Sequence, residues 1–591
     1  MLSLQRQDEN PCRPRHFKPP PCAPIVTDTQ AHARIETCRT RLLVAAALFI
    51  GVFLVIAARL VDVALIPGAA AEPRIGRVAR PLLPPPARAS IIDRNGMLLA
   101  TTLDSPSLYA DARQVIDPNE ATRSLLTVLP GLDPTKVYAD LTSGKSFIWI
   151  KRHLTPRQQY DVNRLGIPGL QFEHEALRFY PFGNLTAHVV GYSKIFDNRG
   201  LGGVERSFDS VLKERHEPLQ LSLDARVQFV LRDELSKVIT DFNAKGAAGI
   251  VMDVRTGEII AMVSLPDFDP NHPMGVNGDE TPDEIKERLF NKATLGDYEL
   301  GSVFKIFNTA MALDDGVATM TSRYDASHPI HVGRFTITDY HGKDRWLSVP
   351  EIFMYSSNIG SARMALAAGE QRQKAFLRKV GLLTQPRVQL DEVSTPHYPK
   401  DWRDVNVMTI AYGHGISVSP LGCLTAAAAI INGGILHPAT ILKVPPGTTP
   451  PGERVISQKT SDEMRKLMRL VVEYGTARQA AAPGYVVGGK TGTAEKNKHG
   501  RYELTTLVST FVGAFPMNDP RYAVLALVDE PHGNKESHGY ATAGWTVVPA
   551  TSRIIERIAP LLGVAPVDES SPAIEDALQV KSLIGRRIEA Y

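Results

Sequence analysis

A serine and a lysine stand three positions apart at Ser302 and Lys305, a spacing that suits nucleophilic catalysis. Three residues make nearly one helical turn, so both side chains share a face if the segment is helical. Gly301 precedes the pair and the apolar run FKIFNTAMAL follows, which predicts a helix that begins near the serine. Free N–H groups at a helix N-terminus favour a developing oxyanion. A lysine desolvated by an apolar helix is a base that can activate the serine for acyl transfer.

The same spacing occurs a second time, at Ser210 and Lys213. No glycine precedes this pair, and the charged stretch KERHEP begins at its lysine. So short a motif arises by chance in a long chain, and strongly charged segments stay in water. We therefore predict that Ser210 and Lys213 lie at the solvated end of a helix, and that Ser302 is the nucleophile.

A Ser-Ser-Asn segment at 356–358 follows the Ser302 motif in the chain. Ser356 is expected to relay a proton between a lysine and the leaving amine, and Asn358 to offer its amide to the substrate backbone. Taken alone, Ser-Ser-Asn is an ordinary turn or helix cap. Its position between two lysine-containing motifs favours the catalytic interpretation.

The segment Lys490-Thr491-Gly492-Thr493 follows two glycines in a strand-like stretch. Small residues in a strand let a substrate peptide approach and add as a further strand. We predict that Lys490, as a catalytic residue, binds a terminal carboxylate with the hydroxyls of Thr491 and Thr493, and that Gly492 belongs to the same substrate-binding strand. The backbone N–H groups of Ser302 and Thr493 are the expected oxyanion hole.

These motifs belong to one domain, expected over residues 236–562. AGIVMDVRTGEIIAMVSLP predicts two strands around the turn Arg255-Thr256-Gly257. Helix-like stretches follow in the middle of the domain (FKIFNTAMALDD, LTAAAAIINGG, SDEMRKLMRLVVEYG), and strand-like stretches close it (VVGGKTGTA, TLVSTFVGAF, YAVLALVDEP). Helices between terminal strands favour an α/β (α+β) fold, in which helices cover an antiparallel sheet and form a helical lobe.

Residues 88–235 precede this domain and are expected to form an elongated, mixed α/β pedestal without chemistry of its own. Asn95-Gly96 separates two apolar runs and predicts a hairpin, and SFIWIKRHL reads as a strand. The remaining segments are a cytoplasmic tail at 1–41, a membrane anchor at 42–65, a stiff Pro/Ala-rich linker at 66–87, and a loose, variable, Pro- and acid-rich tail at 563–591.

The expected anchor is an apolar run near the N-terminus. No charged residue lies between Leu42 and Ala58, and the run continues past Arg59. About 20 apolar residues cross a bilayer as a helix. The alternatives are a buried core helix, and a signal peptide cleaved at the alanines of 69–71. Three arginines flank the run on each side, so charge alone does not set its orientation.

Bulk composition excludes several classes of function. The net charge is only +3, which gives no basis for nucleic-acid binding. Cys12, Cys22 and Cys38 precede the apolar run and Cys423 follows it, so no disulfide framework is expected in the folded part. No Cys/His spacing resembles a metal site, and neither a metal nor a cofactor is expected.

Taken together, Ser-x-x-Lys, Ser-x-Asn and Lys-Thr-Gly in this order resemble the marks of penicillin-binding proteins and serine β-lactamases. Further stretches look like the division-specific, septal class B penicillin-binding proteins of Gram-negative bacteria: YELGSVFK, YSSNIG, YGHGISVSPLG, INGG, KTGTAEK, IIDRNG and RFYPFG. The resemblance covers roughly residues 88 to 560. The chain departs from it modestly, with Glu-Leu-Gly where many relatives have Glu-Pro-Gly, and with Gly422-Cys423 after Pro420-Leu421.

This resemblance implies a penicillin-binding/β-lactamase-like fold and a peptidoglycan D,D-transpeptidase. Ser302 would attack the D-Ala-D-Ala bond of a stem peptide, and the side-chain amine of a second stem peptide would take the acyl group. β-Lactams would acylate the same serine. The resemblance also implies a single-pass inner-membrane protein with a cytoplasmic N-terminus and a periplasmic catalytic domain. The pedestal would contact divisome proteins, including a glycan-polymerising membrane partner.

Three alternatives stay open at this stage. A β-lactamase shares the three motifs, but no Glu-x-x-Leu-Asn stretch of the class A enzymes follows Asn358, and the long pedestal argues against it. An elongation-specific transpeptidase paralogue has the same chemistry. A divisome scaffold that binds β-lactams without turnover would keep the fold and leave the motifs idle.

Overall fold

The computed structural model of the chain falls into two compact units, residues 1–83 and 84–591. The structure describes residues 29–65, 88–194, 198–275, 280–333, 335–448, 450–498 and 501–578. The predicted linker at 66–87 lies outside the described residues, as do residues 1–28 of the predicted cytoplasmic tail and the end of the chain after 578.

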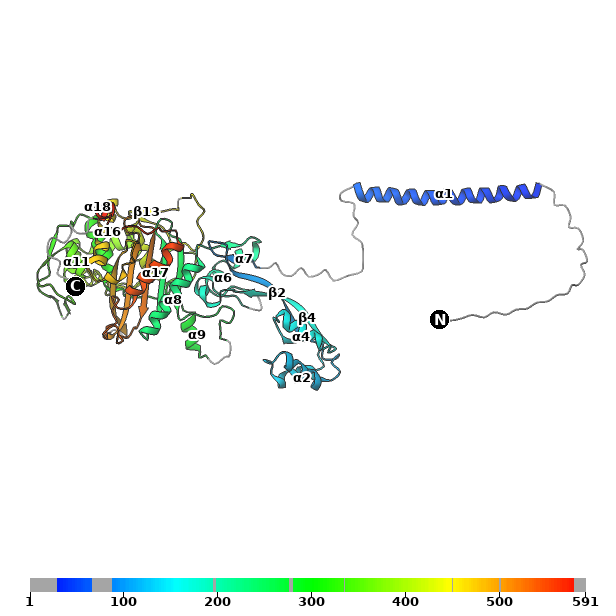
Figure 1. The fold of residues 1–591 in the computed structure, drawn as a ribbon, viewed down its shortest axis with the longest axis horizontal. Helices are drawn as coiled ribbons and strands as arrows, with labels where there is room; N and C mark the ends of the chain where they lie inside the picture. Colours follow the sequence, from blue (N-terminus) through cyan, green and yellow to red (C-terminus); the bar gives the residue numbers. More distant parts are fainter. Residues whose placement is uncertain are drawn as a thin grey trace, which may run out of the picture. The chain divides into compact units, whose positions relative to one another are not determined.

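The first unit contains one long helix, α1 (Thr29–Leu65), drawn in blue in Figure 1. Its stretch Arg39–Ala58 has a mean hydropathy of 2.6 and is not buried against any described part of the chain. By length and composition this stretch can cross a bilayer. The absence of burial within the described residues argues against the alternative of a core helix.

The front module of the second unit is built on a five-stranded sheet in the order β3-β2-β1-β5, with β4 also paired to β2. The long strand β2 is antiparallel to β1, β3 and β4, while β1 and β5 run parallel. The predicted hairpin is confirmed, because β1 and β2 pair across a turn in which Gly96 has a φ of 87°. The strands are β1 (Ile91–Ile92), β2 (Leu98–Ala110), β3 (Ile148–Lys151), β4 (Leu170–Phe179) and β5 (Leu219–Gln220).

Three helices pack on this sheet and begin in the same way. Asp117, Asp133 and Thr155 are N-caps whose side chains accept backbone N–H groups, and a proline follows each of them. These helices and β2 enclose a small core of their own, made of Leu108, Leu125, Val137, Leu141, Leu154 and their neighbours. The helical segments of the module are α2 (Pro118–Val128), α3 (Pro134–Thr142), α4 (Pro156–Arg164), η1 (Gly183–Thr186), α5 (Ala187–Val190), α6 (Gly203–Ser207) and α7 (Asp209–Glu214).

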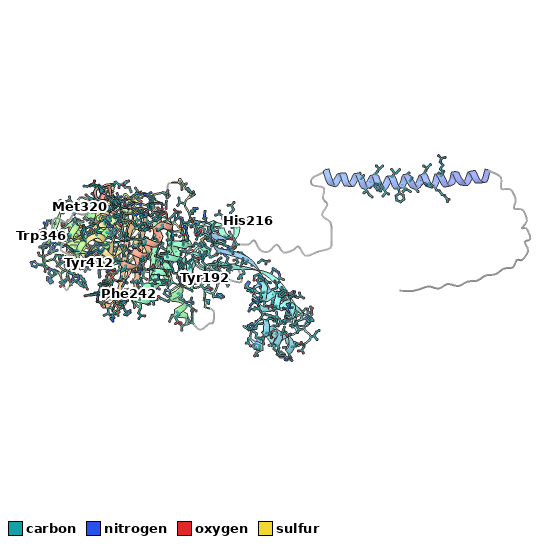
Figure 2. The ribbon with its side chains drawn as sticks, in the orientation of Figure 1. Tyr192, His216, Phe242, Met320, Trp346 and Tyr412 are labelled. Atoms are coloured by element: carbon teal, nitrogen blue, oxygen red, sulfur yellow. The ribbon has the colours of Figure 1, made fainter. Side chains whose placement is uncertain are left out.

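A buried ion network holds the base of the front module together. Glu205 accepts Arg88 Nε at 2.5 Å and Arg178 Nε at 2.7 Å, and both oxygens of its carboxylate are used. One carboxylate between two guanidiniums is well compensated for the loss of water. Close by, Tyr192, which Figure 2 labels, packs edge-on against Phe268 of the following domain, with ring centroids 5.5 Å apart.

The following domain contains a five-stranded, wholly antiparallel sheet in the order β14-β15-β16-β6-β7. The predicted turn at Arg255-Thr256-Gly257 joins β6 to β7, so this prediction is confirmed. Strand β14 carries the Lys-Thr-Gly motif and lies at one edge of the sheet. The strands are β6 (Gly246–Asp253), β7 (Ile259–Leu265), β14 (Gly488–Lys498), β15 (Arg501–Phe515) and β16 (Tyr522–Asp529).

Helices cover both faces of this sheet. Helices α8 (Ala225–Asp241) and α17 (Val547–Leu561) pack side by side on the face seen in Figure 1, and α15 (Pro420–Ile431) and α16 (Gln458–Tyr474) cover the other. Every residue of the central strand β16 is buried, as expected for a strand covered on both sides. The predicted antiparallel sheet with covering helices is therefore confirmed.

A helical lobe adjoins the sheet and includes segments that the sequence did not predict. Short hairpins pair β8 with β11 and β9 with β10. The remaining elements of the domain are α9 (Pro282–Leu289), η2 (Gly301–Phe304), α10 (Lys305–Asp314), β8 (Arg323–Asp325), β9 (Ile330–Val332), β10 (Phe335–Ile337), β11 (Trp346–Ser348), α11 (Val349–Tyr355), α12 (Asn358–Ala368), α13 (Glu370–Lys379), α14 (Asp404–Ile410), β12 (Ile435–Leu436), β13 (Glu453–Arg454) and η3 (Arg478–Ala480).

The segment after residue 562 differs from the prediction of a loose tail. Glu569 accepts a hydrogen bond from Arg469 of α16 at 2.6 Å and another from the Gly484 amide at 2.8 Å. Helix α18 (Pro572–Leu578) then buries Ile574 and Leu578. The prediction is wrong as far as residue 578, because two apolar side chains and one ion pair outweigh the polar composition of the segment.

Candidate active site

The predicted nucleophile lies in a tight turn directly before α10. Ser302 belongs to the 3₁₀ turn η2, which continues into the α-helix at Lys305. Gly301 begins the turn with a φ of 54°, a left-handed conformation that glycine adopts without strain. The prediction of a helix that starts at the serine is thus confirmed, with a first turn of 3₁₀ geometry. Ser302 remains partly exposed, whereas Lys305 is completely buried.

The amine of Lys305 lies at the centre of the site. Its Nζ is 2.9 Å from Ser302 Oγ, 3.1 Å from Ser356 Oγ and 2.7 Å from Asn358 Oδ1. It also donates to the backbone carbonyl of Ser356 at 2.6 Å. The structure therefore brings together the Ser-x-x-Lys and Ser-x-Asn motifs that the sequence places more than 50 residues apart.

Burial decides the protonation state of Lys305. Removal of the ammonium from water lowers the pKa of Lys305 well below its usual range, and the nearby charge of Lys490 lowers it further. The carboxylate of Asp339 acts in the opposite direction and is the weakest of the three influences. A lysine amine with a lowered pKa, 2.9 Å from a hydroxyl, is well placed to accept its proton, so the geometry suits the predicted role of Lys305 as the base.

The turn between α11 and α12 presents Ser356 in an unusual backbone conformation. Ser356 caps the C-terminal end of α11 with a φ of 60° and a ψ of 40°, which costs a non-glycine residue roughly 1 kcal/mol or more. Ser357 then starts α12 as its N-cap, and it donates to Asp339 at 2.6 Å. Asp339 also accepts the Ile359 amide at 3.0 Å. These contacts hold both the hydroxyl and the carbonyl of Ser356 against Lys305.

Asn358 is already engaged on both ends of its amide. Its Oδ1 accepts from Lys305, and its Nδ2 donates to the carbonyl of Thr338 at 3.0 Å. One N–H of the amide remains available to a substrate. The predicted contact of Asn358 with a substrate backbone stays a prediction.

Lys490, on strand β14 of the sheet, also contacts Ser356. Its side chain is fully buried, and its Nζ lies 3.0 Å from Ser356 Oγ and 3.2 Å from the carbonyl of Thr491. Burial lowers the pKa of Lys490 to about 7. The hydroxyl of Ser356 thus bridges two amines, at 3.1 Å and 3.0 Å, which is the geometry that a proton relay requires.

Two glycines allow β14 to lie against the nucleophile turn. A Cβ on Gly492 would come within 2.1 Å of the Leu300 carbonyl oxygen, and a Cβ on Gly301 within 2.6 Å of the Thr493 carbonyl oxygen. Neither position tolerates a side chain without a shift of the backbone. This close packing places the motif of β14 beside Ser302.

The threonines of the motif share one face of β14, because side chains alternate along a strand. Thr491 Oγ1 is 2.7 Å from Thr476 Oγ1, and Thr493 Oγ1 accepts the Ala543 amide at 3.2 Å. Each hydroxyl can still form another hydrogen bond. Their binding of a carboxylate, and the oxyanion hole of Ser302 and Thr493, stay predictions.

Comparisons with known proteins match both parts of the second unit. Residues 247–547 match the penicillin-binding protein transpeptidase domain, and residues 84–238 match the penicillin-binding protein dimerisation domain. The chain belongs to the penicillin-binding transpeptidase family.

Individual relatives span most of the chain. A probable peptidoglycan D,D-transpeptidase FtsI of Caulobacter vibrioides is 42% identical over 491 residues, which cover 81% of this chain and 82% of the relative. The peptidoglycan D,D-transpeptidase FtsI of Escherichia coli is 28% identical, over 77% and 81% of the two chains. The crystal structure of penicillin binding protein 3 from Mycobacterium tuberculosis in complex with aztreonam is 26% identical, with a TM-score of 0.64 over 82% of this chain and 98% of that one.

Sequence reasoning missed several residues of this transpeptidase site. Asp339 holds the Ser356 turn, yet it lies in the unpredicted hairpin region. Glu299, His414 and Tyr502 gather beside the nucleophile turn. The sequence signals for two of them were their places in stretches that resemble the family: Glu299 in YELGSVFK, three residues before Ser302, and His414 in YGHGISVSPLG.

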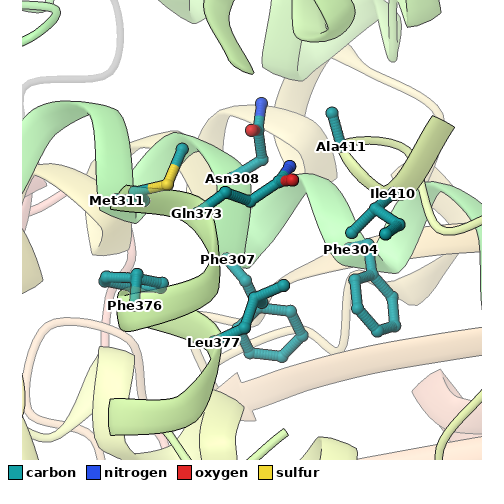
Figure 3. A pocket seen from close by; sticks show the side chains of 9 residues that line it. All are labelled: Phe304, Phe307, Asn308, Met311, Gln373, Phe376, Leu377, Ile410 and Ala411. Carbon is teal, nitrogen blue, oxygen red and sulfur yellow. The ribbon is translucent and has the colours of Figure 1, made fainter. Parts of the chain in front are cut away.

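A small cavity adjoins the nucleophile helix but is separate from the transpeptidase chemistry. Phe304, Phe307 and Met311 line it together with residues of α13 (Figure 3). Ser302 and Lys305 are not among its lining residues. Among the described residues, no group of three or more His, Cys, Asp or Glu side chains is arranged to hold a metal ion.

Proposed function

We infer that this chain is a peptidoglycan D,D-transpeptidase that cross-links stem peptides through an acyl-enzyme on Ser302. The observation that carries this inference is the fully buried amine of Lys305, 2.9 Å from Ser302 Oγ and connected through the Ser356 hydroxyl to a second buried lysine, with burial lowering the pKa of Lys305. Membership in the penicillin-binding transpeptidase family supports it.

Acylation follows from these contacts. Ser302 Oγ attacks the carbonyl carbon of the D-Ala-D-Ala bond while Lys305 takes its proton. The backbone N–H groups of Ser302 and Thr493 hold the oxyanion of the tetrahedral intermediate. As the intermediate collapses, a proton passes through Ser356 to the nitrogen of the departing D-Ala, and an ester on Ser302 remains.

Transfer reverses these roles. The side-chain amine of a second stem peptide attacks the ester carbon, Lys305 receives a proton from that nitrogen, and Ser302 Oγ leaves with a proton returned to it. An amide cross-link forms and the free serine is regenerated. A β-lactam is attacked in the same way, but its leaving nitrogen stays tethered in the opened ring, which favours a lasting acyl-enzyme.

The donor is held through its terminal carboxylate. Lys490 supplies a positive charge, and the hydroxyls of Thr491 and Thr493 face the same side of β14. Because β14 is an edge strand, the donor peptide can lie along it as an added strand, while Gly492 allows this strand to lie against the turn that carries Ser302.

We further propose that the chain is a single-pass inner-membrane protein with a cytoplasmic N-terminus and a periplasmic catalytic domain. The span Arg39–Ala58 and the FtsI relatives support this topology. The same relatives support a role in septal cross-linking during cell division. The front module would then contact divisome proteins, including a glycan-polymerising membrane partner.

Mass spectrometry of the full chain in detergent tests the chemistry. After treatment with benzylpenicillin, the peptide that contains Ser302 should gain the mass of the drug, and the adduct should persist for many minutes. A chromogenic cephalosporin distinguishes the β-lactamase alternative. Rapid multiple turnover of that compound, or the absence of any adduct, contradicts the proposed function.

Depletion of the protein in its host cell separates the septal role from the elongation alternative. Filamentous cells are expected if cross-linking fails at the septum. Round cells would instead assign the chain to elongation and leave its chemistry unchanged.

A further inference from the structure

A carboxyl group without an assigned role lies beside the nucleophile turn. Glu299, three residues before Ser302, is half-buried. Its carboxylate accepts the Gly415 amide at 3.2 Å and the hydroxyl of Tyr502 at 3.1 Å from each oxygen. Among the described residues, the groups that affect its pKa by contact are the Gly415 amide and the Tyr502 hydroxyl, and neither is a cation. None of the acylation steps derived above uses this group.

The loop between α14 and α15, which lies beside Glu299, packs directly onto the nucleophile turn. A Cβ on Gly413 would come within 2.1 Å of the Gly301 carbonyl oxygen, so the loop between α14 and α15 touches the residue before the nucleophile. In this loop the ring of His414 lies 5.6 Å from the ring of Tyr502. Glu299 and these two side chains therefore form one cluster at the nucleophile turn.

The charges in this cluster favour a cationic ligand. Burial lowers the pKa of His414 to about 4, so its imidazole is neutral at neutral pH. Burial also raises the pKa of Glu299, against the opposing hydrogen bonds from Gly415 and Tyr502. A partly desolvated carboxyl that has no counter-ion within the described part of the chain gains free energy when a cation binds beside it.

The reaction has one substrate of that charge. The donor peptide ends in a carboxylate, which Glu299 repels and Lys490 attracts. The acceptor carries a side-chain amine, which is an ammonium ion at neutral pH and must lose a proton before it can attack the ester. A carboxylate near the ester is suited both to attract this ammonium and to take that proton.

We propose that Glu299, with Tyr502 and His414 beside it, forms the subsite that receives the side-chain ammonium of the acceptor peptide. This subsite rests on the proposed transpeptidase function. The ammonium gives one proton to the Glu299 carboxylate and becomes a neutral amine, whose lone pair forms the new C–N bond as the ester C–O bond breaks. The amine's second proton passes to Lys305 and then to Ser302 Oγ, and Glu299 releases its proton to water.

The test measures how the acyl-enzyme divides between water and the acceptor. The full chain in detergent is supplied with a thioester donor that acylates Ser302, and with a short peptide whose one free amine is on a diamino-acid side chain. The ratio of amide product to hydrolysed product is measured against acceptor concentration. This ratio is counted per acyl-enzyme formed, so it does not depend on the rate of acylation.

Glu299→Gln keeps the size of the side chain and its contacts but removes the charge. The acceptor concentration for half-maximal amide formation should rise by about tenfold or more, the value of one charge-assisted hydrogen bond. Glu453→Gln, an exposed acid on β13, is the matched control and should behave as the wild type. Methoxyamine, which is neutral at pH 7, is the second probe. The loss of amide formation in the variant, relative to the wild type, should be at least tenfold smaller with methoxyamine than with the charged peptide.

The proposed subsite is overturned if Glu299→Gln and the wild type give the same ratio of amide to hydrolysed product at every acceptor concentration. It is also overturned if the variant loses amide formation equally with the charged peptide and with methoxyamine. If Glu299→Gln fails to fold, Glu299→Asp takes its place, because it retains the charge one methylene further back. An intermediate ratio for that variant supports the subsite, and an unchanged ratio contradicts it. Failure of the wild type to form any acyl-enzyme would instead contradict the proposed function.

Discussion

Two segments of this chain carry the same Ser-x-x-Lys spacing and have very different surroundings. Lys305 is fully buried, with its Nζ 2.9 Å from Ser302 Oγ and within 3.1 Å of Ser356 Oγ. Lys213 is 41% exposed and pairs with Asp209 at 2.8 Å, one helical turn back along α7. Ser210 is exposed to solvent.

The difference indicates that burial and neighbouring amines, rather than the Ser-x-x-Lys spacing alone, distinguish the predicted nucleophile. Lys213 is partly exposed to water and forms an ordinary surface ion pair with Asp209. Burial lowers the pKa of Lys305, and the charge of nearby Lys490 lowers it further, while no carboxylate forms an ion pair among the described contacts of its Nζ. The prediction that the 210–213 segment is a solvated helix end is confirmed.

The largest expected effect comes from replacing each of the two serines with alanine. Ser302→Ala should abolish covalent labelling by benzylpenicillin and lower the acylation rate by about 10⁶, because no other group can form the ester. Ser210→Ala is the control and should be labelled as the wild type is. Intact-protein mass spectrometry measures both, and an adduct on Ser302→Ala would assign the nucleophile elsewhere.

Replacing each of the two lysines with methionine should have the next largest effect. Lys305→Met removes the base but keeps an apolar stem in the buried site, and acylation should slow by about 10² to 10⁴. Lys213→Met loses only a surface ion pair and should not change the rate. Stopped-flow labelling with a fluorescent penicillin measures the two rates, and equal rates would show that Lys305 is not the base.

Contact between β14 and the nucleophile turn places the Lys-Thr-Gly motif beside Ser302. Gly492→Ala places a methyl group 2.1 Å from the Leu300 carbonyl oxygen, which pushes the strand away. A displacement of about 1 Å should reduce the acylation rate by roughly 10². Gly131→Ala meets no atom within 4 Å and is the control. Thermal unfolding of both variants separates this effect from loss of the fold, and unimpaired acylation would contradict it.

The smallest expected effect is a change in the pH profile. The pKa of Lys490 is lowered to about 7, so its positive charge is lost as pH rises through that value. The second-order rate of acylation by a carboxylate-bearing penicillin should then fall by up to about tenfold per pH unit above the pKa. In Lys490→Arg the guanidinium stays protonated, and this alkaline limb should disappear whatever the absolute rate. An unchanged limb would assign the titration to another group.

Local patterns were enough to predict much of the fold. Asn95-Gly96 and Arg255-Thr256-Gly257 specify turns through glycines in left-handed conformations, which few other residues adopt. The helical and strand-like stretches of the sheet domain were also recognisable from their periodicity. The tail after residue 562 was wrongly predicted, because Glu569 is ordered by Arg469, a partner 100 residues away.

The sequence by itself determined which residue types are present and in what order: the predicted nucleophile Ser302, two lysines, the predicted relay Ser356 and a strand that contains glycines. Only the tertiary structure decided what these residues do. The protonation state of Lys305 depends on burial and on Lys490, which is distant in the chain, and the cluster of Glu299, His414 and Tyr502 comes from three separate segments. Desolvation and through-space charge depend on distance in the fold, which spacing along the chain does not encode.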